Sequence, residues 1–156
     1  TVDEEISRIE RELRGLGAEH RYVPLLMTIP GVAWILGYTI AAEIGEIDRF
    51  RGPKQLVGYT GLCPKVIQSG GQDRRGPLAK NGPKYLRWGY IEAATHACCH
   101  EPYRPLYQRT KQRLGRNRGA KIATITVARK LAEASWWMLS KGEPFAPAGA
   151  TQVLAA

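Results

Sequence analysis

Apolar residues recur at helical spacing along most of this chain, and this periodicity constrains the fold more than any other feature. From Val2 to Leu16, for example, successive apolar residues are four, three, four and three positions apart, as on one face of a helix. Apolar residues make up 44% of the 156 residues, which is enough for a single packed core. The pattern predicts an all-α, mostly helical domain.

The first helical segment has the a/d seam of a coiled coil. This N-terminal seam consists of Val2, Ile6, Ile9, Leu13 and Leu16. It starts in mid-pattern with no cap before it, so we expect residues 1–20 to be the end of a coiled-coil linker in a longer protein. Two heptads alone are marginal in water. The alternative is therefore a short amphipathic helix that lies on the domain's own core.

The remaining pattern predicts a domain over residues 21–143 and a loose Pro/Ala-rich tail over residues 144–156. The expected helices cover residues 24–28, 33–44, Pro53 to about Gly61, 83–100 with Asn81 as N-cap, part of 104–118, and a long buried helix through Ala123 and Met138 that ends before Gly142.

Between residues 62 and 82 the periodicity vanishes. This stretch contains Gly70, Gly71, Gly76, Gly82, Pro64 and Pro77. Such a composition predicts a long Gly-rich basic loop with room for a small hairpin. Loops of this length in compact domains are usually functional or disordered.

Positive charge is concentrated after residue 50. Residues 1–50 carry 5 Lys/Arg and 9 Asp/Glu, whereas residues 51–156 carry 18 and 5. This excess favours a polyanionic partner such as nucleic acid. An anionic membrane surface would give the same bias, but no apolar run approaches the ~20 residues that cross a bilayer, and no signal peptide opens the chain. We expect a cytoplasmic, soluble protein, and the odd, partly adjacent cysteines fit a reducing compartment.

Pro30 and Gly31 lie between two expected helices, as in a helix-hairpin-helix unit at residues 25–45. In such a unit a glycine lets the turn approach a phosphate, and the second helix receives the phosphate with its free N–H groups. Ala33 stands where the usual motif has a second glycine. A purely structural αα-hairpin is the alternative.

The serine loop at residues 62–82 carries the clearest candidate for chemistry. Ser69 is followed by Gly70 and Gly71, which remove side-chain bulk beside its hydroxyl. The cations that could neutralise a phosphate are Arg74, Arg75, Lys80, Lys84 and Arg87. A serine needs a base or a metal to take its proton, so a simple turn is the alternative interpretation.

We expect no metal site in this chain. His96, Cys99 and His100 share a helical face, but no second ligand pair at suitable spacing accompanies them. A core histidine beside buried cysteines is the simpler interpretation. The carboxylates after residue 50 show no pairing at short spacing of the kind that binds two divalent ions.

Several short motifs occur together in the order and spacing of one family. They are Ile29–Val32, Ala41–Phe50, Pro53–Leu56, Gly61–Pro64, Ser69–Gly71, Arg75–Gly76, Lys80–Gly82, Tyr85–Arg87 and Ala128–Leu131. From about Leu25 to Phe145 the chain resembles the C-terminal domain of the IS116/IS110/IS902-type DEDD/serine transposases, which are related to the pilin-gene invertases.

The resemblance implies a function and partners. In that family an N-terminal RuvC-like domain holds Mg²⁺ with a DEDD set of carboxylates and joins the C-terminal domain through a coiled coil. The enzymes cut and rejoin DNA, and a structured bridge RNA selects target and donor. The family's nucleophile is the serine that matches Ser69. We therefore expect DNA and a guide RNA as partners, a homo-oligomer through the coiled coil, and a bacterial or archaeal source.

The resemblance also implies which activity to expect from this chain when the rest of the protein is absent. The DEDD carboxylates would lie outside it, so we expect it to bind nucleic acid but to cut little. Two other functions remain open at this point. One is a non-catalytic helix-hairpin-helix module that grips a nucleic-acid backbone, and the other is an assembly module whose helices mediate oligomerisation.

Overall fold

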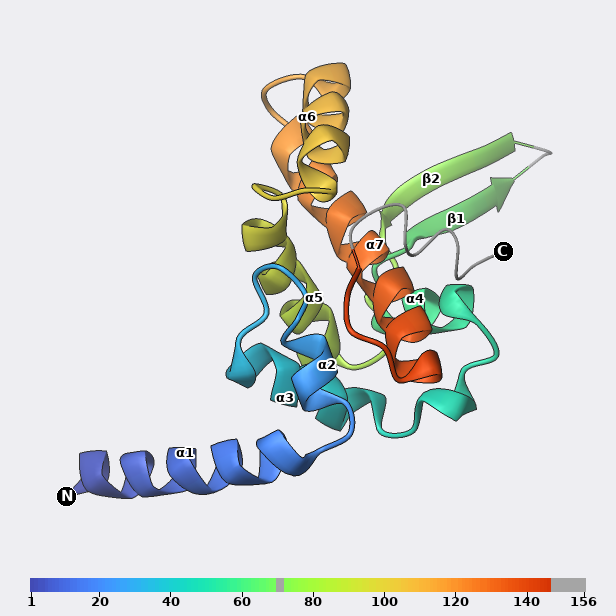
Figure 1. Ribbon diagram of the computed structural model, residues 1–156. Coiled ribbons are helices and arrows are strands. Elements are labelled where there is room, and N and C mark those ends of the chain that lie inside the picture. The colour runs from blue at the N-terminus through green and yellow to red at the C-terminus, as the bar shows by residue number, and fades with distance from the viewer. Residues whose placement is uncertain (70–71, 147–156) are drawn as a thin grey trace.

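The structure is a computed structural model that describes residues 1–69 and 72–146, with the backbone alone between residues 65 and 76. Its described elements are α1 (Val2–Glu19), α2 (Val23–Leu26), α3 (Trp34–Ile44), the short 3₁₀ helix η1 (Ile47–Arg49), α4 (Pro53–Thr60), β1 (Pro64–Ser69), β2 (Gln72–Leu78), α5 (Lys84–Ala97), α6 (Tyr103–Leu114) and α7 (Gly119–Lys141). The prediction of an all-α, mostly helical fold is confirmed (Figure 1).

Helix α7 is the centre of the packing. It contacts α2, α4, α5, α6 and η1. Its buried residues include Ala123, Val127, Ala128, Leu131 and Ala132, and α5 contributes the fully buried Ala93, Ala94 and Ala97. Helix axes approach to a distance set by the side chains at the contact, so these small residues allow close helix packing. Within the described residues, none of the helices is both long and apolar enough to cross a membrane.

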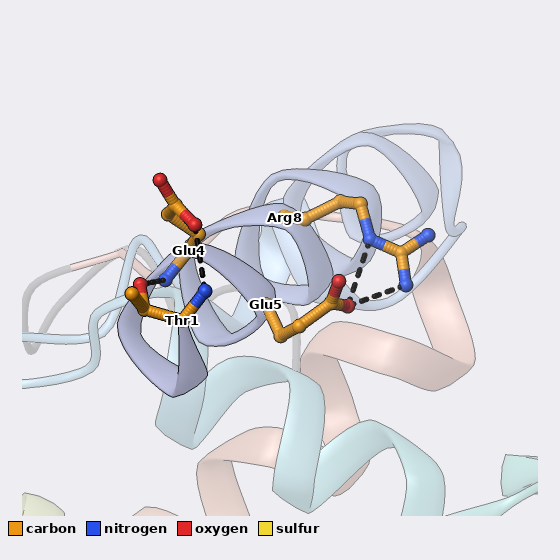
Figure 2. Close-up of polar contacts among 4 residues, drawn as sticks. All are labelled: Thr1, Glu4, Glu5 and Arg8. Atoms are coloured by element: carbon orange, nitrogen blue, oxygen red, sulfur yellow. Dashed lines mark hydrogen bonds and ion pairs between the residues drawn. The ribbon is translucent and has the colours of Figure 1, made fainter.

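Helix α1 has a cap, which corrects the expectation of an uncapped start. The Thr1 hydroxyl accepts a hydrogen bond from the Glu4 amide at 3.3 Å, and the Glu4 carboxylate accepts one from the Thr1 amino group at 2.7 Å (Figure 2). This reciprocal pair is a capping box. One turn further along, Arg8 forms an ion pair with Glu5 at 2.7 Å.

The N-terminal seam does not lie on the domain's own core. Figure 1 shows α1 extending away from the other helices. The seam residues Val2, Ile6, Ile9 and Leu16 are 75%, 49%, 48% and 63% exposed. Contact with the body is confined to the end of the helix, where the buried Gly17 packs against Tyr38 and Val23. The alternative of an amphipathic helix on the core is therefore wrong for this chain.

The turn between α2 and α3 packs tightly on α5. Gly31 has a φ of +88°, and a Cβ atom built on it would lie 2.6 Å from the Cβ of His96 and 2.9 Å from the carbonyl oxygen of Ala93. On either side of it, Ile29 and Val32 are buried. Glycine is therefore required here both by the backbone conformation and by the close approach of a neighbouring helix.

Packing continues beyond residue 143, where the sequence places the end of the domain. Phe145 packs against the core, and its ring lies 6.1 Å from that of Tyr103. Its backbone N–H donates a 2.8 Å hydrogen bond to the Thr28 hydroxyl. This contact ties the segment after α7 to the end of α2.

The expected loop at residues 62–82 contains a β-hairpin. Strands β1 and β2 pair antiparallel, with a register irregularity between Pro64 and Val66. In Figure 1 the hairpin projects from the side of the helical body. The sequence left room for such a hairpin but did not predict the strands, because their proline and glycine residues are poor strand formers.

The base of the hairpin is held by contacts with α4 and α7. Ala79 and Lys80 donate backbone hydrogen bonds to the carbonyls of Cys63 at 2.9 Å and Gly61 at 3.2 Å. From α7, the Arg129 guanidinium donates to the carbonyl of Leu62 at 3.2 Å. A Cβ on Gly82 would lie 2.0 Å from the Tyr59 carbonyl oxygen at the end of α4. Asn81 does not cap α5, since that helix begins after Pro83 without a side-chain cap.

Replacing Gly31 by alanine should lower the free energy of unfolding by about 3 kcal/mol, because it combines a positive φ with overpacking against α5. Gly142→Ala is the matched control: its φ is +67° in the left-handed helical region, but nothing lies within 4 Å of the added Cβ. The control should lose only about 1 kcal/mol. Urea denaturation measures both, and equal losses would contradict the packing of this turn on α5.

Arg129→Gln should lower the free energy of unfolding by about 2 kcal/mol, since a charge-assisted hydrogen bond to Leu62 is lost. It should also speed hydrogen exchange at the Ala79 amide, which bonds across the hairpin base. Lys130→Gln is the control, because its exposed pair with Glu133 contributes only about 0.5 kcal/mol. Unchanged exchange at Ala79 in the Arg129 variant would argue against this role.

Candidate functional site

Ser69 is the last residue of β1, at the far end of the hairpin from its base. Its Cα pairs with that of Gln72 across the hairpin, and Arg74 and Arg75 of β2 pair with Ile67 and Val66. Gly70 and Gly71, which connect the strands, lie outside the described residues. The structure thus brings the backbone of the two arginines into the same hairpin as the serine.

The other three predicted cations lie near the base of the hairpin instead. Lys80 has a φ of 51° and lies two residues after the end of β2. Lys84 and Arg87 belong to the first turn of α5. Five residues of strand separate Pro64 from Ser69, which is about 17 Å of extended chain. The predicted ring of cations is therefore divided between the two ends of the hairpin.

Arg87 reaches beneath the hairpin base. Its Nη1 atom is buried and has no hydrogen-bond partner within the described part of the chain. A Cβ atom on Gly61 would lie 3.0 Å from this nitrogen. A buried guanidinium nitrogen without an acceptor is costly, and because this atom is not accessible from the surface, it does not by itself mark a binding site.

Lys84 lies beside exposed aromatic residues. Its ammonium group is 5.1 Å from the centre of the Tyr85 ring. Tyr85 and Trp88, one turn apart on α5, are 57% and 45% exposed. A cation next to exposed rings can interact with both the phosphates and the bases of a nucleic acid.

The turn at Pro30 and Gly31 is separate from the hairpin. Pro30 is half-buried, and the missing side chain of Gly31 makes room for α5, as described above. Close helix packing alone therefore accounts for this glycine. No residue of the turn contributes a positive charge, so any attraction of a phosphate to it would depend on backbone N–H groups.

The histidines near the end of α5 are exposed, which corrects the expectation of a core histidine. His96, Cys99 and His100 all face solvent, and Cys98 alone of the group is buried. Burial raises the pKa of the Cys98 thiol, and the neighbouring Cys99 thiol adds to the effect. Among the described residues, no three His, Cys, Asp or Glu side chains come together as a metal site would require.

Arg129 was not singled out from the sequence as a site residue. Its guanidinium comes from the far end of the chain and holds the hairpin base at Leu62. The available signal was a lone arginine between the buried residues Ala128 and Leu131. Such a position requires a polar partner for the guanidinium inside the fold.

Known proteins resemble this chain over most of its length. It is 29% identical to a probable family 20 transposase of Pseudomonas aeruginosa, over 94% of this chain and 44% of that protein. It is 26% identical to the transposase for insertion sequence element IS1328 of Yersinia enterocolitica, over 91% of this chain and 43% of the relative. With the transposase for IS1111A of Coxiella burnetii the identity is 26%, over 92% and 40%.

The chain thus spans about two-fifths of the length of these relatives. The family model described as Transposase IS116/IS110/IS902 family matches residues 23–108, from the start of α2 into α6. The matched region includes the whole hairpin and its base. The chain belongs to the IS116/IS110/IS902 family of transposases.

Proposed function

We propose that this chain is the DNA-binding, nucleophile-bearing part of a transposase that cuts and rejoins DNA, with Ser69 as the nucleophile. The observation that carries the proposal is the membership of the transposase family, combined with a serine at the end of a projecting hairpin. Such a position leaves room for a DNA strand to approach, whereas a serine in the helical core would be inaccessible.

The proposed step is a transfer of a phosphoryl group to the serine. The Ser69 Oγ attacks a phosphorus atom of the DNA backbone and forms a new P–O bond. The bond between that phosphorus and one bridging oxygen breaks, and the released sugar oxygen takes up a proton. The serine proton passes to a base. Attack by another DNA hydroxyl on the Ser69 phosphoester reverses these changes and rejoins a strand.

The cations near both ends of the hairpin would hold the DNA backbone. Arg74 and Arg75 lie on β2, whose backbone pairs with that of β1. Lys80, Lys84 and Arg87 lie near the base, and the half-buried Arg87 would add to the positive charge there. Charge–phosphate contacts of this kind position a strand without reading its sequence.

Mg²⁺ would be held by carboxylates outside this chain, in the RuvC-like DEDD domain that the family resemblance implies. There it would stabilise charge on the phosphoryl oxygens or assist loss of the serine proton. The chain's own contribution is to present Ser69 and to neutralise phosphates. By itself it would bind DNA, and a structured guide RNA, without efficient cleavage.

Ser69→Ala should abolish strand cleavage by the whole protein with its RNA, DNA and Mg²⁺, by roughly 10³-fold or more, as for loss of other nucleophiles. The wild-type reaction, denatured, should contain DNA bound covalently to a peptide with Ser69, identified by mass spectrometry. Ser7→Ala, on the exposed surface of α1, is the control and should cleave normally. Intact cleavage by the Ser69 variant would mean that metal-activated water cuts and that this chain is a DNA-gripping module.

We also propose that the N-terminal seam pairs with a second copy as part of a longer coiled coil. The exposed residues Val2, Ile6 and Ile9 are costly to leave in water and suit an a/d interface. Isolated α1 offers only a short seam, so the pairing would need the remainder of the coiled coil.

Ile6→Asp should weaken self-association of the whole protein by at least about tenfold, because it places a charge in an apolar seam. Ser7→Asp adds the same charge to the neighbouring exposed position and should have little effect. Analytical ultracentrifugation across a range of concentrations compares the two. Equal association constants for both variants would show that the seam does not form the interface.

A further inference from the structure

The connection between α6 and α7 is the most cationic part of the described surface outside the hairpin. We define residues 108–122 as the α6–α7 tip; it contains six cations and no acidic residue. The six are Arg109, Lys111, Arg113, Arg116, Arg118 and Lys121. In Figure 1 the tip lies at the top of the view, whereas the hairpin projects from the side.

All six cations of the tip are exposed. Some cations elsewhere in the chain form ion pairs: Arg8 with Glu5, Arg104 with Glu101, and Lys130 with Glu133. No described acidic side chain forms an ion pair with any of the six. Apart from the contact of Lys111 with the Tyr107 ring at 5.9 Å, their mutual repulsion is relieved by solvent and salt.

Helix stability explains only part of this charge. Lys111 and Arg113 lie in the last turn of α6, where cations favour the helix. Arg116 and Arg118 lie beyond that turn, and Lys121 lies in the first turn of α7, where a positive charge is unfavourable. These three positions cost free energy in the isolated chain and need another reason.

The tip has a fixed backbone rather than a loose one. The Gly119 amide donates to the Gly115 carbonyl at 2.9 Å. A Cβ on Gly119 would lie 2.4 Å from the Lys111 carbonyl oxygen, so the two helices meet closely here. This contact holds the cations at the end of α6 beside those at the start of α7.

An open hollow of about 460 Å³ lies on the tip. Its lining consists of Gln108, Lys111, Gln112, Gly115 and Arg116. Lys111 and Arg116 end in N–H donors, and the two glutamines carry both a donor and an acceptor. The hollow can therefore donate several hydrogen bonds to an acceptor-rich anion.

We infer that the α6–α7 tip binds the phosphate backbone of duplex DNA, at a surface distinct from the Ser69 hairpin. The identity of the polyanion as DNA rests on the proposed function. The charge pattern supports a backbone rather than bases, because the six cations are exposed, whereas the aromatic residue next to the tip, Tyr107, is half-buried with its ring 5.9 Å from the Lys111 ammonium. One DNA segment could then be held at the tip while another strand is cut at the hairpin.

The test compares two triple variants of the full 156-residue chain. Arg113→Gln, Arg116→Gln and Arg118→Gln remove three of the six positive charges of the tip. Arg8→Gln, Arg11→Gln and Arg14→Gln remove the same charge from α1, which lies at the opposite end of the view in Figure 1. Glutamine has a helix propensity close to that of arginine, so both variants should fold, which circular dichroism checks.

The measurement is the salt dependence of binding to a random-sequence DNA duplex of about 30 base pairs, by fluorescence anisotropy between about 50 and 200 mM salt. The tip variant should reduce the slope of log K against log salt by about 2 to 3, because each lost phosphate contact removes about 0.9. Its affinity should fall at least tenfold. The α1 variant should retain nearly the wild-type slope.

Equal slopes for the two variants would overturn the inference, since net charge alone would then explain binding. The same salt dependence is measured for binding to duplex RNA and to single-stranded DNA of the same sequence. A larger loss of slope on either of these than on duplex DNA would also overturn it. Ser69→Ala should leave all slopes unchanged. If no DNA adduct forms on Ser69, the proposed chemistry is wrong but this inference can still hold. If the salt dependence does not change in the tip variant, this inference is wrong but the proposed chemistry can still hold.

Discussion

The close packing of α7 against α5 is the contact on which the rest of the structure depends. Small residues on both helices are fully buried, including Ala94 and Ala97 of α5 and Ala128 and Ala132 of α7. Close approach increases the number of dispersion contacts along both backbones. Enlarging any of these residues would separate the helices. Because α7 also contacts α2, α4 and α6, their placement follows from the same interface.

Polar side chains on α7 also form hydrogen bonds that hold the segments on either side of α4, next to the candidate site. Trp136 donates its indole N–H to the Phe50 carbonyl at 3.0 Å, which fixes the chain before α4. Arg129 holds the carbonyl of Leu62, just after α4. Both acceptors are backbone groups that would otherwise lose hydrogen bonds on burial. Helix α7 thus holds the chain before and after α4, and the hairpin that follows carries Ser69.

Local pattern was sufficient to predict the helices but not the hairpin. Apolar periodicity and terminating residues such as Gly61 and Gly142 marked the helices because one face of each must be buried. The pairing of Lys80 with Gly61 joins residues far apart in sequence, which no local pattern encodes. The cations near Ser69 were identified by type, yet their division between the two ends of the hairpin depends on strand length. Exposure of His96 depends on how α5 is rotated against its neighbours, which is a tertiary property.

The position of α7 within the chain has a consequence for biosynthesis. The central helix is the last of the described helices along the chain, and the bond from Phe145 to Thr28 closes a separation of 117 positions. While the ribosome is still adding α7, the surfaces of α2, α4 and α5 that pack against it are not yet covered. Such exposed surfaces are prone to aggregate and to engage chaperones. Completion of this domain therefore follows its synthesis instead of keeping pace with it.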